Sequence, residues 1–272
     1  SIIGNVFSYP DVSTDSRSVI RLASIVRDRH HPGKTIFSNN YCFRDGAWCL
    51  RAYNGPLVVS DNIMNGTASM STLTALCQGC DPGTKNNLIE RNVFYSPEEY
   101  ASEPGPAVGM GSKDIGVIRN NIFYNALSTK ISLSYVPMDQ NPGPGNYGNE
   151  SDKLYVYHNV VYNHDITKGM AVYTRTEANL IDVRNNIFYN IGPSDQYHSI
   201  IRIDNFSKIQ NLTIDNNLWY SPNIPKPVYM NGISLNLTAW SDNFNISYNE
   251  LCSQDYDDIC DDYNPKFLNT NS

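Results

Sequence analysis

Arginine and tyrosine side chains recur within short apolar stretches of the chain, and they are the residues best suited to bind a ligand. The stretches are SVIRLA (18–23), WCLRAY (48–53), VYTRTE (172–177), IIRIDN (200–205) and PVYMNG (227–232). Because successive side chains of a β-strand point to opposite faces, the polar residues of these stretches would share the outer face of a sheet. They are Arg21, Arg51, Tyr53, Tyr173, Arg175, Arg202, Asp204 and Tyr229.

Such a face is predicted to bind a polysaccharide, either acidic or neutral. The planar arginine fork suits a carboxylate or a sulfate, and a tyrosine ring offers a face to a sugar ring. The alternative is a solvated sheet face on which the arginine stems cover apolar neighbours. In either case the residues of opposite parity, including Leu50, Ile201 and Ile203, are expected to face the core.

Six cysteines indicate disulfide bonds and an oxidising compartment, because their number is even and no zinc or catalytic pattern accompanies them. They are Cys42, Cys49, Cys77, Cys80, Cys252 and Cys260. Cys252 and Cys260 lie eight positions apart and are predicted to pair. The other four allow three pairings, of which Cys42–Cys49 with Cys77–Cys80 is the most local. A four-cysteine zinc site and a redox role for CQGC (77–80) are the alternatives.

Six sequons for N-glycosylation are compatible with a secreted glycoprotein, although chance alone predicts about that many in so asparagine-rich a chain. They begin at Asn65, Asn149, Asn205, Asn211, Asn236 and Asn245. The stretch NELCSQDYDDICDDYNP (249–265) is strongly acidic. Its carboxylates could ligate Ca²⁺, but a solvated acidic loop is the favoured interpretation, and no cofactor or metal site is predicted.

One ten-residue phrase recurs along the chain, as GVIRNNIFYN (116–125) and again as IDVRNNIFYN (181–190). Looser copies share one asparagine and lie 22 to 38 residues apart. The aligned asparagines are Asn5, Asn40, Asn62, Asn92, Asn121, Asn159, Asn186 and Asn217. Such self-similarity is typical of a solenoid, and the period-two alternation of apolar residues around each asparagine predicts strands.

The aligned asparagine is expected to stand at a sharp bend between two strands. Asparagine tolerates the left-handed backbone conformation, and stacked amides can hydrogen-bond from one coil to the next. With this turn and its asparagine ladder, the chain resembles the right-handed parallel β-helix family of pectate-lyase-like proteins over residues 2–221, and on to about 267. The resemblance implies an all-β, right-handed parallel β-helix of about eight or nine coils.

In the resembling family the substrate groove lies along strands like those that carry the arginines and tyrosines. A glycoside hydrolase needs two carboxyl groups roughly 5–9.5 Å apart, and the outer positions supply Asp204, with Glu177 and Asp45 near strand ends. A lyase would pair a basic residue with a Ca²⁺-binding acidic cluster, which does not accompany the basic residues here. Those basic candidates are Arg51, Arg175 and Arg202. The catalytic residues therefore stay unassigned.

Composition narrows the class of protein further. Charged residues make up 17% of the 272 residues and the net charge is −7, which argues against nucleic acid as a partner. No apolar run reaches the ~18 residues of a membrane span. Residues 1–272 are expected to form one domain. Because the first residues already match the repeat and no capping unit is apparent, copies are expected to associate head-to-tail through open coil ends.

Two functions remain open from the sequence. The preferred one is an extracellular or cell-surface structural glycoprotein, such as a filament subunit or an adhesin. The alternative is a polysaccharide-active lyase or hydrolase, or a carbohydrate-binding protein, that uses the outer arginine and tyrosine face.

Overall fold

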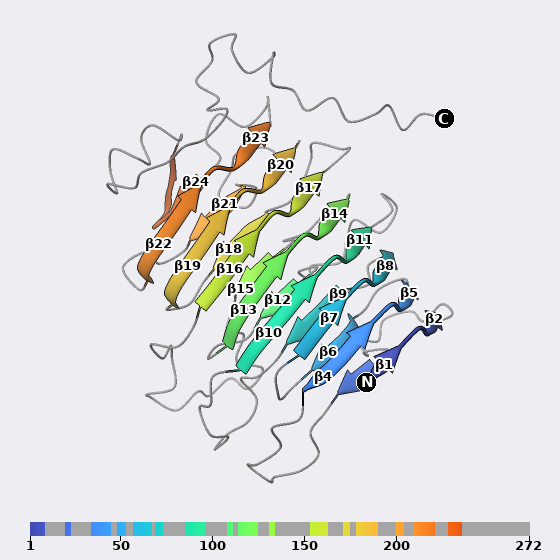
Figure 1. The fold of residues 1–272 in the computed structure, drawn as a ribbon. Coiled ribbons are helices and arrows are strands. Elements are labelled where there is room, and N and C mark those ends of the chain that lie inside the picture. Colours follow the sequence, from blue (N-terminus) through green and yellow to red (C-terminus); the bar gives the residue numbers. More distant parts are fainter. Residues whose placement is uncertain are drawn as a thin grey trace, which may run out of the picture.

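The chain is all-β in its described parts and forms a parallel β-helix. The computed structural model describes residues 1–8, 20–22, 34–44, 48–52, 57–66, 69–72, 85–95, 108–110, 114–124, 131–133, 153–162, 171–174, 178–189, 200–203, 209–220 and 228–235. Their strands form three sheets, and each coil contributes one strand to each sheet. Figure 1 shows the coils stacked in chain order, from the N-terminal coil in blue to the last ones in orange.

The first and second sheets are wholly parallel and have eight strands each. The first sheet contains β1 (Ile2–Ile3), β4 (Thr35–Ser38), β7 (Leu57–Ser60), β10 (Lys85–Glu90), β13 (Asp114–Arg119), β16 (Lys153–Tyr157), β19 (Ala178–Arg184) and β22 (Ile209–Asp215). The second sheet contains β2 (Val6–Ser8), β5 (Tyr41–Arg44), β8 (Ile63–Gly66), β11 (Val93–Tyr95), β14 (Ile122–Tyr124), β17 (Val160–Tyr162), β20 (Ile187–Tyr189) and β23 (Leu218–Tyr220). The eight coils confirm the fold class expected from the repeat.

The third sheet is parallel except at its C-terminal edge, where its last two strands pair antiparallel. It contains β3 (Ile20–Leu22), β6 (Trp48–Ala52), β9 (Ser69–Thr72), β12 (Val108–Met110), β15 (Ile131–Leu133), β18 (Val172–Thr174), β21 (Ile201–Ile203), β24 (Val228–Met230) and β25 (Ile233–Leu235). Across the described ranges, no helix is long and apolar enough to cross a membrane.

The core is a set of columns in which each coil places an apolar side chain above its counterpart in the coil below. Phe94 lies on Phe123 with ring centroids 4.8 Å apart and nearly parallel planes, and Phe188 lies against Trp219. Leu50, Ile201 and Ile203 are buried, as their parity in the sequence predicted. Burial of these columns supplies the hydrophobic stabilisation that no single coil could gain alone.

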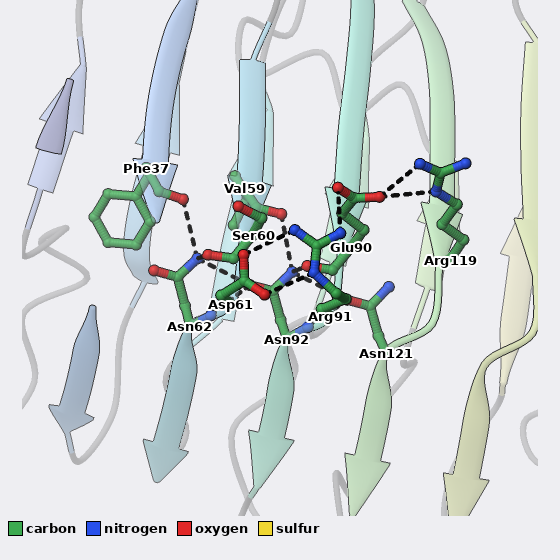
Figure 2. Close-up of polar contacts among 10 residues, drawn as sticks. All are labelled: Phe37, Val59, Ser60, Asp61, Asn62, Glu90, Arg91, Asn92, Arg119 and Asn121. Carbon is green, nitrogen blue, oxygen red and sulfur yellow. Dashed lines mark hydrogen bonds and ion pairs between the residues drawn. The ribbon is translucent and has the colours of Figure 1, made fainter. Parts of the chain in front are cut away.

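The eight predicted asparagines form a continuous ladder at the turn between the first and second sheets, as the sequence led us to expect. Asn121 is representative: its Nδ2 donates to Oδ1 of Asn159 (3.0 Å) and to the backbone oxygen of Ile89 (2.9 Å). Its Oδ1 accepts from the backbone N–H and from Nδ2 of Asn92, both at 3.0 Å. Figure 2 shows Asn62, Asn92 and Asn121 side by side in this stack.

Every polar group of an interior ladder asparagine such as Asn92 is used, including the backbone. The carbonyl of Asn92 accepts from the N–H of Ile122 at 2.9 Å, and the N–H of Asn92 donates to Oδ1 of Asn121. Because these groups are buried, a side chain here must both donate and accept at fixed positions. Asparagine meets this demand, whereas aspartate lacks the donor and alanine lacks both.

The left-handed residue of the turn is the one directly before each ladder asparagine, so the expectation that the ladder asparagine itself takes this conformation was wrong. At this turn the residues with positive φ are Gly4 (72°), Asn39 (55°), Asp61 (60°), Arg91 (55°), Asn120 (54°), His158 (54°), Asn185 (57°) and Asn216 (54°). From Asn40 to Asn217, each ladder asparagine keeps its side chain buried in the stack, and the exposed residue before it takes the left-handed conformation. Most of these neighbours are Asn, Asp or Gly, which tolerate this conformation best.

Removing one ladder amide should destabilise the whole β-helix. Asn121→Ala would leave buried groups of Asn92, Asn159 and Ile89 without a partner, and we expect a loss of about 2–4 kcal/mol in the free energy of unfolding. Denaturant unfolding followed by circular dichroism measures it. The matched control is Asn120→Gly in the same turn, which should change stability by less than about 0.5 kcal/mol. Equal stability of Asn121→Ala and the wild type would contradict the role of the ladder.

The left-handed position gives a second test at His158, which is exposed and has φ 54°. His158→Gly should stabilise the protein by up to about 1 kcal/mol, because glycine adopts this conformation without strain. His158→Val should destabilise it by at least about 1 kcal/mol, because a β-branched side chain is poorly tolerated there. Thermal melting distinguishes the two variants, and the reverse order of melting temperatures would refute the assignment of the turn.

Candidate functional site

The predicted arginine and tyrosine face lies on the outside of the third sheet where the structure describes it. Arg202 stands between two buried isoleucines of β21, and Tyr229 stands between buried Val228 and Met230 of β24. The two outer residues are paired in register, and the guanidinium carbon of Arg202 lies 5.0 Å from the ring centroid of Tyr229. This is a cation–π contact, which holds both side chains against the sheet.

The remaining members of this face divide into two groups at opposite ends of the sheet. The register runs from Arg21 to Arg51 at one end and from Tyr173 through Arg202 to Tyr229 at the other. Between the groups the same outer column passes through Ser71, Gly109 and Ser132. The side chains of Arg21, Arg51 and Tyr173, and the whole of Tyr53, Arg175 and Asp204, lie outside the described residues.

Charged groups gather instead at the turn beside the ladder. Arg91 bridges two carboxylates: its Nε lies 2.7 Å from Oδ1 of Asp61, and its Nη1 lies 2.6 Å from Oε1 of Glu90. Arg119 binds the other oxygen of Glu90 at 2.7 Å. Figure 2 shows Arg91 between the two carboxylates and Arg119 on the far side of Glu90. A second set joins Asp182 to Arg184 and to the hydroxyl of Tyr157, each at 2.6 Å.

The carboxylates of Asp61 and Glu90 are held ionised, which suits a structural role better than acid catalysis. Burial alone would raise the pKa of Glu90, but hydrogen bonds from Arg119 and Arg91 outweigh it and lower the pKa. The hydrogen bond from Arg91 likewise lowers the pKa of Asp61. A glycosidase needs a carboxylic acid whose pKa is raised, so that it stays protonated. Within the described ranges, no group of three or more His, Cys, Asp or Glu is placed to hold a metal ion.

The outer face of the second sheet carries a feature that the sequence analysis did not identify. Tyrosines stand three positions after five successive ladder asparagines, on strands β11 to β23. Consecutive rings are stacked, with centroids 4.9–5.3 Å apart. Beside them, one position after each ladder asparagine, runs a column of aliphatic residues in the same register.

We call these two columns the tyrosine–aliphatic strip. Its members are Tyr95, Tyr124, Tyr162, Tyr189 and Tyr220 with Val93, Ile122, Val160, Ile187 and Leu218. The tyrosines are half-buried, and Ile122 is 45% exposed, as is Ile63 on the adjoining strand β8. None of the ten residues is charged. Their signal in the sequence is the tyrosine in the middle of FYS, FYN, VYN, FYN and WYS, which the repeat pattern assigns only to a strand.

Burial also raises the pKa of Tyr162, and the neighbouring hydroxyls of Tyr124 and Tyr189 add to this effect. The Tyr162 hydroxyl therefore stays protonated through neutral and mildly alkaline pH. A phenol hydroxyl both donates and accepts hydrogen bonds. The strip thus presents a row of polar hydroxyls beside a row of apolar side chains, repeated once per coil.

The cysteines and sequons are described in part. Cys42 is buried on β5 and is disulfide-bonded. The side chain of Cys49 and the whole of Cys77, Cys80, Cys252 and Cys260 lie outside the described residues, so the predicted pairings stay predictions. Asn211 is exposed on β22. Asn65, in contrast, donates from Nδ2 to the hydroxyl of Tyr41 at 2.9 Å, and its Oδ1 is buried. The sequons at Asn149, Asn205, Asn236 and Asn245 lie outside the described residues.

Comparison of the chain with protein-family models, with curated proteins and with solved structures gave no match. The class of protein is therefore defined by its fold, the parallel β-helix with an asparagine ladder. The structure supports the parallel β-helix that the resemblance implied, and no match supports membership of the pectate-lyase-like family.

The ion pairs of Glu90 make stability depend on acid pH. Because the folded-state pKa of Glu90 is lowered, its contribution is fully present above its unfolded-state pKa of about 4.3 and is lost as pH falls through the folded value. Glu90→Gln should therefore lower the free energy of unfolding at pH 7, and the difference from wild type should shrink below about pH 4. Urea unfolding at pH 7 and pH 3 measures this, and a difference that does not shrink at pH 3 would contradict it.

Proposed function

We propose that this chain is a non-catalytic β-helical protein of the extracellular space or cell surface, which attaches laterally to an extended polymer. The observation that carries the proposal is the tyrosine–aliphatic strip. It is a contiguous, uncharged and partly apolar surface that repeats in each of the last five coils and lies beside a polar rim of ion pairs. Exposed patches of this kind are typical of interaction sites, and the sides of solenoids commonly serve as extended binding surfaces.

The compartment in the proposal is supported by the disulfide bond at Cys42, since disulfides persist mainly in oxidising surroundings. The exposed sequon asparagine Asn211 offers an accessible acceptor for a glycan and agrees with the same compartment. The non-catalytic part is supported by the carboxylates of Asp61 and Glu90, which arginines hold in their ionised form.

The outer column of the third sheet supports a second candidate, a carbohydrate-binding or carbohydrate-cleaving face. Its small residues Ser71, Gly109 and Ser132 lie in register between the arginine pair and the group that contains Arg202 and Tyr229. A polymer bound to this face would meet the guanidinium of Arg202, which lies over the ring of Tyr229. Arginine there would favour an anionic chain, in contrast to the uncharged strip.

Cosedimentation with insoluble extracellular polymers tests both candidates. Purified protein is mixed with chitin, cellulose, calcium pectate gel or collagen fibres, and the bound fraction is measured. One variant places charges on the strip, Ile122→Lys with Ile187→Lys, and the matched control removes the third-sheet pair, Arg202→Ala with Tyr229→Ala. We expect the first variant to lose at least about tenfold in affinity and the second to bind like the wild type.

The reverse pattern would support the third-sheet face in place of the strip. Attachment that survives both double variants, or attachment to none of the polymers, would overturn the proposed function. Circular dichroism melts of both variants establish that they remain folded.

A further inference from the structure

We infer that the tyrosine–aliphatic strip binds a single chain of a neutral, β-linked polysaccharide that lies along the coil axis, with about one sugar ring per coil. This inference rests on the proposed function and names the chemical class of its ligand.

The direction of the chain follows from the repeat of the strip. A polymer that ran parallel to the strands would meet one coil and then leave the sheet, because each strand of the strip is three residues long. A polymer along the coil axis meets the same pair of residues at every step. Consecutive tyrosine centroids are 4.9–5.3 Å apart, and one ring of a linear β-1,4-linked glycan spans a similar length.

The stacking of the tyrosines determines which atoms meet the ligand. Tyr124, Tyr162 and Tyr189 each have a neighbouring ring stacked on both sides. A sugar therefore meets their edges and hydroxyl groups, and these can exchange hydrogen bonds with sugar hydroxyls. The aliphatic column beside them, with Ile122 the most exposed of its residues, offers an apolar surface to the C–H groups of the same sugar ring.

The absence of charge in the strip selects a neutral ligand. A uronate or sulfate group placed here would lose hydration without meeting a cation. The nearest arginines along the chain, Arg91, Arg119 and Arg184, lie at the ladder turn and are engaged by Asp61, Glu90 and Asp182. The strip thus differs from the third sheet, where arginine lies on the outer face.

The size of the strip also argues for a single polymer chain over a second copy of the protein. Five strands about 4.8 Å apart, with two side-chain columns, cover a face of about 300 Å². A stable protein dimer buries about 800 Å² on each partner. A narrow strip that repeats in one direction fits one extended chain.

Binding of oligosaccharides of increasing length tests the inference. Isothermal titration calorimetry compares β-1,4-linked neutral oligosaccharides of two to seven rings, built from glucose, N-acetylglucosamine, xylose or mannose, with oligogalacturonates of the same lengths. In at least one neutral series, we expect the affinity to rise with each ring up to about five, one for each tyrosine coil, and then to level off. The affinity should change little with salt, since no ion pairs form.

Variants locate the binding on the strip. Tyr162→Ala should weaken binding of the five-ring oligosaccharide about tenfold, and Tyr162→Phe, which keeps the ring stack, should weaken it less. Tyr155→Ala on the outer face of the first sheet is the matched control and should bind like the wild type. Melting curves of each variant show whether it is folded.

Three results would overturn the inference. The first is that oligogalacturonates bind and that Tyr162→Ala abolishes this binding. The second is that the affinity for neutral oligosaccharides does not depend on chain length, or is unchanged in Tyr162→Ala. The third is a concentration-dependent dimer, seen by light scattering, that the strip variants dissolve. If strip-dependent attachment to a polymer such as collagen persists while every neutral oligosaccharide fails to bind, the inference fails and the proposed function stands.

Discussion

The hydrogen bond from one asparagine amide to the next is the interaction on which the rest of this structure depends. From Asn40 to Asn186, each ladder amide donates to the next coil and to the backbone of the previous one, and its oxygen receives two bonds in return. This closed arrangement fixes both the distance between coils and the position of the turn in each coil. Because a missing donor or acceptor in the buried stack would be costly, the ladder excludes other registers.

Because the register is fixed, the outward side chains at one position of the repeat stack in a column from coil to coil. The chemistry of a face therefore follows from the residue types at that position. The position three residues after the ladder asparagine gives stacked tyrosines, and the position one residue after it gives aliphatic side chains. The positions just before it gather charges, and Arg91 meets a carboxylate 30 residues away in the sequence. The uncharged columns therefore follow the ladder turn, and the charged residues precede it.

The two candidate binding faces differ in the same physical terms. The strip on the second sheet combines hydroxyls with apolar surface and carries no charge. The outer column of the third sheet places small residues between groups that contain arginine. A neutral polymer suits the first and an anionic polymer suits the second, so one β-helix can offer two chemically distinct sides.

The sequence by itself determined the fold class, because the eight aligned asparagines and the period-two alternation around them are local patterns that each repeat carries in full. It also determined the parity of Leu50, Arg202 and Tyr229, since alternation in a strand requires no knowledge of its neighbours. Only the tertiary structure assigned the left-handed conformation to the residue before each ladder asparagine. Local propensity allows either asparagine of the Asn-Asn pair to take the left-handed conformation. The hydrogen bonds of the stack require the second asparagine for the ladder, so the first one takes this conformation.

The tertiary structure likewise decided which residues share a surface. The register between coils separated the predicted arginines and tyrosines into two groups, and it brought Asp61, Glu90, Arg91 and Arg119 together. The sequence contains the tyrosines of the strip in every repeat from Asn92 onward. A single three-residue strand, however, does not reveal that tyrosines of different coils form one surface. They became a continuous face only when the ladder stacked the coils, because distances between residues about 30 positions apart are set by the register and not by the local sequence.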